Sequence, residues 1–222
     1  MPRKEADHKT GAPRLGARGV LGALRGYLGA GRARGGGRLA GVASLSGFVH
    51  SRASHVAQTA LYGYLRTRAG TRYPELFEND AFLVSINIAK WQLWLACVSD
   101  LGVYAGGRLA ERAERDVAGL MGAVLEGVLA PIGVPADAGL PFPAAAERVC
   151  RRFAACDFAR VADDESAFTE SPAALVRWAP VDDSLKALDE EIIRNSVRFR
   201  WQEVRRELRR DLDAPAVLAS HE

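Results

Sequence analysis

The stretch AFLVSINIAKWQLWLACVSDLGVYA, residues 81–105, decides the fold of this chain. Lys90 and Asp100 are its only charged residues, and Phe, Leu, Ile, Val and Trp dominate the faces of the helix that it would form. A helix that is apolar all round is buried in a protein core or in a membrane. Three polar residues fall seven apart on one narrow stripe and could line a pocket between helices: Ser85, Gln92 and Ser99.

Burial in a protein core is the cheaper of these two alternatives. The apolar span approaches the ~20 residues that cross a bilayer. Lys90 and Asp100, however, would each cost about 2.5–3.5 kcal/mol near the bilayer centre. The first 30 residues lack the continuous apolar stretch of a secretory signal. We therefore expect residues 81–105 to form the central helix of a bundle, and Gly106-Gly107 to end that helix or to bend it sharply.

Helical periodicity recurs on both sides of this stretch, and the sequence contains no alternating strand pattern or internal repeat. Asn79 or Asp80 can cap the central helix. Further helices are expected over residues 44–68, 108–130, 144–161, 171–178 and 184–212. The predicted fold is all-α, a helical bundle of four to five main helices around a central hydrophobic helix. It would occupy residues 44–213 and be followed by a disordered tail over residues 214–222.

Charge is distributed unevenly along a chain whose net charge is only +3. Residues 1–74 hold 13 Lys and Arg against Glu5 and Asp7, a balance of +11, and residues 75–222 carry a balance of −8. No Asp or Glu occurs between His8 and Pro74. A basic leading segment on an acidic body indicates an anionic partner for that segment.

Residues 1–43, which we call the basic arm, are predicted to be flexible and rich in Gly and Arg. Apolar residues recur at helical spacing over residues 14–30, and four arginines follow on another face: Arg14, Arg18, Arg25 and Arg32. This pattern is typical of a basic amphipathic helix. Each interrupting Gly costs about 0.8–1 kcal/mol of helix relative to Ala. The arm would therefore fold only on an anionic surface, or else remain a flexible extension without a partner.

A second basic cluster precedes the central helix and comprises Arg66, Arg68, Arg72 and Tyr73. Its arginines could form an anion-binding lip beside neighbouring tyrosines. They could equally bind the last carbonyl groups of the helix over residues 44–68, which is the ordinary role of cations at a helix C-terminus.

The expected last helix has an acidic first half and a basic second half, which complements the helix dipole. Its acidic cluster, residues 189–191, is interpreted as a solvated face rather than a cation site. Four arginines could bind phosphate or an acidic partner, pair with the acidic loop at residues 163–165, or extend over apolar surface with their charged ends in water: Arg194, Arg198, Arg205 and Arg209. One apolar stripe contains Leu185, Leu188, Ile192 and Phe199, and a second, rotated stripe contains Ile193, Val197, Trp201, Val204 and Leu208.

The commonest catalytic and metal-binding patterns are missing from the sequence. His50 and His55 are five apart, which is not the i, i+4 spacing of a helical metal pair. Cys97, Cys150 and Cys156 are too few for a disulfide framework and indicate a reducing compartment. Neither a Gly-x-Ser-x-Gly elbow nor a phosphate loop occurs. We expect no metal, no cofactor and no catalytic residue that the sequence identifies.

Residues 53–65, ASHVAQTALYGYL, resemble the recognition-helix end of TetR-type repressors, with Thr59, Leu61 and Tyr62 in matching places. The resemblance covers 13 of the 222 residues. A Gly/Arg-rich segment stands where that module has its two preceding helices, and the chain is therefore not assigned to that family.

These patterns favour a non-enzymatic interaction or adaptor protein whose basic arm contacts an anionic membrane surface or an acidic partner. Its expected location is the cytoplasm, at the membrane surface if the arm binds lipid. One alternative is a nucleic-acid-binding regulator that uses the arm and the Arg66–Arg72 cluster. Another is an enzyme with a pocket between helices, lined by Ser85, Gln92, Ser99 and Trp residues.

Overall fold

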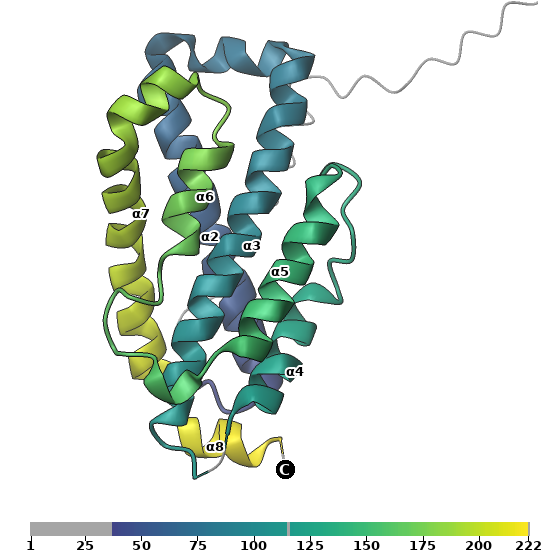
Figure 1. Ribbon diagram of the computed structural model, residues 1–222, viewed down its shortest axis with the longest axis vertical. Coiled ribbons are helices and arrows are strands. Elements are labelled where there is room, and N and C mark those ends of the chain that lie inside the picture. Colours follow the sequence, from purple (N-terminus) through teal and green to yellow (C-terminus); the bar gives the residue numbers. More distant parts are fainter. Residues whose placement is uncertain (1–36, 115, 222) are drawn as a thin grey trace, which may run out of the picture.

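The computed structural model describes residues 37–114 and 116–221, and within these ranges the chain is helical, with no strand (Figure 1). The long helices are α2 (Val42–Ala69), α3 (Asp80–Ala110) and α7 (Asp183–Asp211). The shorter helices are α4 (Ala118–Leu129), α5 (Pro141–Ala155), α6 (Glu170–Trp178) and α8 (Ala214–Ala219). Two 3₁₀ segments, η1 (Gly70–Glu78) and η2 (Phe158–Arg160), complete the described elements.

The predicted all-α bundle around a central hydrophobic helix is confirmed. Helix α3 contacts α2, α4, α5 and α6, whereas α7 packs one layer further out, against α6 and α2 (Figure 1). Every residue of α3 from Trp91 to Leu109 is buried. By length and composition α3 could also cross a membrane. From Trp91 to Leu109 its side chains are instead covered by the neighbouring helices, which is how a core helix is stabilised, whereas Val84 near its start is 61% exposed.

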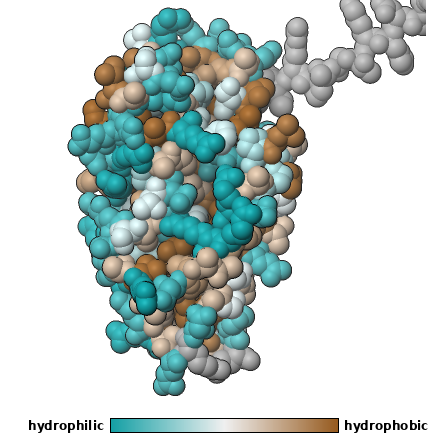
Figure 2. Space-filling view, viewed as in Figure 1, coloured by the Kyte–Doolittle hydropathy of each residue, from teal (hydrophilic) through white to brown (hydrophobic). Residues whose placement is uncertain are grey.

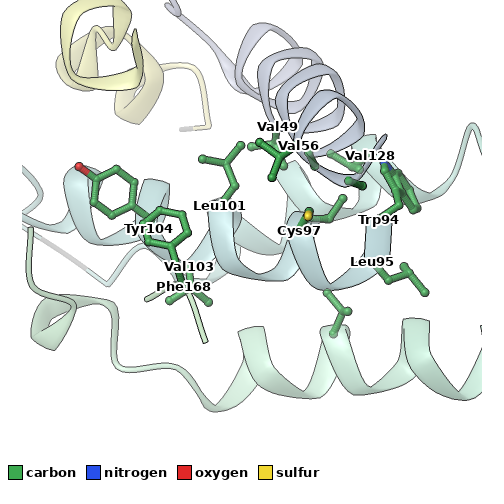
Figure 3. Close-up of a cluster of buried hydrophobic side chains, with 14 of the residues drawn as sticks. Val49, Val56, Trp94, Leu95, Cys97, Leu101, Val103, Tyr104, Val128 and Phe168 are labelled. Carbon is green, nitrogen blue, oxygen red and sulfur yellow. The ribbon is translucent and has the colours of Figure 1, made fainter. Parts of the chain in front are cut away.

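The core lies where α2 and α4 pack on α3. Val49 and Val56 of α2 and Val128 of α4 lie around Cys97 and Leu101, and all five side chains are almost completely buried (Figure 3). Tyr104 and Phe168 extend the core towards α7, where Phe168 stacks on Trp201 with ring centroids 4.9 Å apart. Asn79 caps α3 as expected, since its side chain accepts a hydrogen bond from the Phe82 backbone N–H.

The expected end of the central helix at Gly106-Gly107 is wrong, because α3 continues to Ala110. These glycines are packing positions. A Cβ atom at Gly107 would lie 2.7 Å from the Cβ of Val161, and Cβ atoms at Gly102 and Gly106 would overlap the rings of Phe153 and Phe158. Close packing against α5 and η2 therefore compensates for the low helix propensity of glycine.

Two helices after α3 also differ in their bounds from the expected ones. Because α3 runs on to Ala110, the expected helix over residues 108–130 is reduced to α4, and the Asp116 carboxylate just before it accepts a hydrogen bond from the Ala118 N–H. The expected helix over residues 144–161 begins earlier, at Pro141, and ends at Ala155.

The folded part of the chain extends beyond both ends of the expected domain, residues 44–213. Leu39, which was assigned to the basic arm, is buried, and its backbone pairs with Asp211 and Asp213 in an isolated parallel bridge beside Leu212. The expected disordered tail contains α8, where Ala214 and Val217 are buried. One isolated backbone bridge and two buried side chains leave no periodic pattern in the sequence, so these contacts could not be predicted from periodicity.

Candidate functional site

A groove between α3, α5 and α6 has a volume of about 410 Å³. Helix α3 contributes Gln92, Leu95, Ala96 and Ser99; α5 contributes Ala145, Arg148, Val149, Arg151 and Arg152; α6 contributes Glu170, Ala173, Ala174, Arg177 and Trp178. Alanines from all three helices leave the space open. Hydrophilic side chains gather over this part of the molecule (Figure 2). The volume lies within the range of small-ligand and peptide-anchor pockets.

The floor of the groove rests on a buried carboxylate, Asp100, which is fully enclosed. Its oxygens accept hydrogen bonds from the Arg152 guanidinium at 2.8 Å and from the Ser171 hydroxyl at 2.7 Å. They also accept from the backbone N–H groups of Glu170 and Ser171, at 3.1 and 2.8 Å. Asp100 therefore satisfies donors in the first turn of α6, where a negative charge is favoured.

This network ties four helices together. Arg152 of α5 also donates to Ser99 of α3 and to the Ala167 carbonyl, and Trp201 of α7 donates to the Ser171 hydroxyl at 3.0 Å. Burial raises the pKa of Asp100, and the neighbouring Arg152 opposes this shift. Because its members come from α3, α5, α6 and α7, the network fixes how α5 and α6 sit on α3 and hence the width of the groove.

Four guanidinium groups line the groove against one carboxylate, Glu170. Two of them already form ion pairs within the chain: Arg152 with Asp100, and Arg151 with Glu147 at 2.9 Å. Arg148 and Arg177 are exposed, and neither forms an ion pair with another described residue, although Arg177 lies over the Trp178 ring. These two side chains leave positive charge at the rim that a bound anion could neutralise.

The predicted polar stripe along α3 is partly brought together here. Gln92 and Ser99 are buried in the wall of the groove, and one half-buried tryptophan, Trp178 from α6, also lines it. The Gln92 Nε2 atom is buried and has no hydrogen-bond partner among the described residues. Ser85 lies elsewhere, exposed, with its hydroxyl bonded to the Ala81 carbonyl. The expected pocket therefore contains two of its three polar residues.

The cluster Arg66, Arg68, Arg72 and Tyr73 is largely paired within the chain. Arg68 forms an ion pair with Asp189 of α7, which also accepts a hydrogen bond from Tyr64 at 3.1 Å. Arg72 pairs with Glu75 at 3.1 Å, and the Tyr73 ring packs edge-on against Phe77. Arg66 is exposed at the end of α2. Most of the positive charge that an anion would need is thus already neutralised, and use of this cluster as a binding lip stays a prediction.

The arginines predicted for the basic arm, Arg14, Arg18, Arg25 and Arg32, lie outside the described residues. Their contact with an anionic partner also stays a prediction.

Two of the four arginines that could pair with the acidic loop do so, whereas Arg194 pairs with Glu190 and Arg198 forms no ion pair with a described residue. Arg209 donates to the Asp163 carboxylate at 3.0 Å, and Arg205 donates to the Asp163 carbonyl at 2.8 Å. Tyr104 of α3 donates to the same carboxylate at 2.5 Å. Hydrogen bonds from Tyr104 and Arg209 outweigh partial burial, so the pKa of Asp163 lies below its usual value. Arg205 and Arg209 therefore hold α7 against α3 through Asp163, which also bonds Tyr104 of α3.

No group of three or more His, Cys, Asp or Glu side chains that could hold a metal occurs in residues 37–114 and 116–221. His50 packs edge-on against Trp94, 5.7 Å between ring centroids, and burial lowers its pKa. The three cysteines are free, and Cys97 is buried in the core as expected.

Sequence reasoning missed Arg148 and Arg177 as the free cations of the groove. A signal existed for the first, because Arg148, Arg151 and Arg152 share one side of α5 at i, i+3 and i+4 spacing. Arg177 is the one basic residue of the nine-residue helix α6, and only the packing of α6 places it here.

Comparisons of the chain with protein-family models, with curated proteins and with solved structures found no significant match. The function must therefore be argued from the groove and the charge distribution.

Proposed function

We propose that this protein is a helical interaction protein that binds an acidic segment of a partner protein. The segment would lie in the groove between α3, α5 and α6 while the basic arm adds longer-range attraction. The observation that carries this proposal is the arginine lining: four guanidinium groups face one carboxylate, and Arg148 and Arg177 have no acidic partner among the described residues.

The shape of the site favours a protein segment over a membrane surface. A lipid leaflet is broad, whereas this groove is a concave site of about 410 Å³ between three helices. A partner carboxylate that pairs with Arg148 or Arg177 gains a charge-assisted hydrogen bond at the rim of the groove. Trp178 offers an apolar and aromatic surface for a neighbouring side chain of the partner.

The basic arm fits the same partner. Its balance of positive charge would raise the association rate with an acidic segment and make that rate strongly dependent on salt. The arm and the groove are separable in an experiment, because their arginines can be replaced independently in the full chain.

The test measures binding of a labelled peptide of about ten glutamates by fluorescence anisotropy, at low and moderate salt. Arg148→Gln/Arg177→Gln is expected to raise the Kd about tenfold, as expected for loss of about 1.4 kcal/mol. The matched control, Arg160→Gln/Arg210→Gln, removes the same charge where Asp157 and Asp211 already pair with it. It should change the Kd less than about twofold. Replacing Arg14, Arg18, Arg25 and Arg32 by Gln should slow association at low salt.

Equal effects of the groove variant and its control would reject the groove as the binding site. Anionic phosphatidylserine vesicles and a short DNA duplex serve as competing targets for the full chain. Tight binding to either, with no measurable binding of the acidic peptide, would reject the proposed partner class in favour of a membrane or nucleic-acid function.

A further inference from the structure

An apolar stripe along the outer face of α7 has no cover among the described residues. Phe199, Ile192 and Leu188 are 70%, 71% and 79% exposed, and Leu185 is 38% exposed. The stripe follows steps of three, four and seven residues, so it runs along one face of the helix. Figure 2 shows apolar side chains on the flank of the molecule where Figure 1 places α7. Contiguous exposed apolar side chains mark interaction surfaces more often than isolated ones do.

The stripe has the spacing of a coiled-coil seam. If Leu185, Ile192 and Phe199 occupy successive a positions, then Leu188 and Asn195 occupy the d positions between them. Asn195 is exposed and interrupts the apolar seam at its centre. A polar residue at such a position lowers stability but fixes the register and orientation of the partner helix.

The charges that flank the seam indicate what covers it. Glu191 and Arg198 lie at successive g positions, both are exposed, and neither forms an ion pair within the described part of the chain. In an antiparallel pair of α7 helices centred near Asn195, Glu191 of one copy faces Arg198 of the other. The twofold axis then generates the same ion pair a second time.

Other occupants fit these charges less well. A parallel pair would place the acidic halves of both helices side by side, which is repulsive. A helix that lies on a membrane carries Lys and Arg along its apolar face. The first half of this stripe is instead flanked by two acidic residues, Asp189 at the e position and Glu191 at the g position.

We propose that the protein forms an antiparallel homodimer through the Leu185–Phe199 stripe of α7, with Glu191 of each copy paired to Arg198 of the other. This surface lies on a different element from the arginine-lined groove. Dimerisation would leave the groove of each copy free, because the groove is built by α3, α5 and α6. A dimer would present two such grooves, and a partner with two acidic segments would bind it with increased avidity.

Sedimentation equilibrium of the full chain tests the proposal at concentrations from about 1 to about 100 µM, which spans weak to stable interfaces. The expected result is a concentration-dependent rise from 23.9 kDa to twice that mass. Phe199→Asp should abolish the rise. Leu140→Asp replaces an equally apolar side chain, 97% exposed, outside α7 and should leave it unchanged.

Charge reversal tests the orientation of the two copies. Glu191→Arg and Arg198→Glu should each weaken dimerisation by about tenfold or more, because each creates two repulsive contacts. The double variant Glu191→Arg/Arg198→Glu should restore dimerisation to within about threefold of the original. Both residues are exposed, so unchanged helical circular dichroism is expected for every variant. A chain that stays monomeric throughout, or a double variant as weak as the single ones, would overturn the proposal.

Discussion

Gly102 lies in the middle of α3, where helix propensity alone would favour almost any other residue. A Cβ atom there would overlap the ring of Phe153 from α5. The glycines of α3 therefore set the distance at which α5 packs, and with it the geometry of the groove. From the sequence, Gly106-Gly107 indicated a helix end or bend. A glycine that ends a helix cannot be distinguished by sequence from a glycine that lets another helix pack closely, because the packing neighbour is known only from the structure.

Replacing Gly102 by Ala is expected to lower the free energy of unfolding by about 1–3 kcal/mol, since overpacking outweighs the gain in helix propensity. The matched substitution is Gly122→Ala in α4, where a Cβ atom meets no other atom within 4 Å. It should raise the free energy of unfolding by about 0.5–1 kcal/mol. Urea denaturation measures both values. A stabilising Gly102→Ala substitution would show that α5 does not pack where it is described.

Asp100 shows which part of the site the sequence could reveal. A lone acid in an apolar helix was visible as a costly residue, and burial does raise its pKa. Its partners, Arg152 and Ser171, lie 52 and 71 residues further along the chain. No local pattern links such distant positions. The sequence therefore indicates that a buried Asp100 needs a hydrogen-bonding partner, but it does not indicate which residues supply it.

Helix α7 illustrates what could be predicted at the scale of an element. Its two apolar stripes and its polarity of charge were visible in the sequence, and the stripe from Ile193 to Leu208 is buried as a core face must be. Periodicity could not decide which stripe faces the core. The exposed stripe is equally apolar over Leu188 and Ile192, and only the positions of α2 and α6 distinguish the two.

The contact between α7 and the Asp163 loop predicts a specific pH dependence. The folded-state pKa of Asp163 is below the usual 3.8, so the unfolded chain binds the proton more readily. The stabilisation is therefore fully present above about pH 3.8 and is lost as the pH falls through the folded-state pKa. Asp163→Asn should lower the free energy of unfolding by about 1 kcal/mol at pH 7, a modest value because the group is partly exposed.

Urea denaturation between pH 7 and pH 3 measures this contribution. The difference between the original chain and Asp163→Asn should shrink below pH 3.8. Glu165→Gln lies in the same loop, and its side chain forms no ion pair with a described residue. That substitution should change little at any pH. A difference for Asp163→Asn that grows as the pH falls would contradict the pairing of Asp163 with Tyr104 and Arg209.

For the whole molecule, the all-α class and the central helix could be predicted, because an apolar stretch of this length leaves few alternatives to burial. The limits of the folded unit could not, because Leu39 and α8 are held by short tertiary contacts. The groove was foreseen only as polar residues along α3, since its arginines come from helices whose packing the sequence does not specify.

The central claim is that residues 91–109 of α3 are shielded by the rest of the chain and so support the groove. Hydrogen exchange of the full chain, in buffer without lipid or detergent, tests this most directly. Amides of residues 91–109 are expected to exchange slowest of all and only through global unfolding. Exchange of these amides well before global unfolding, or protection that arises only when detergent is added, would contradict the claim.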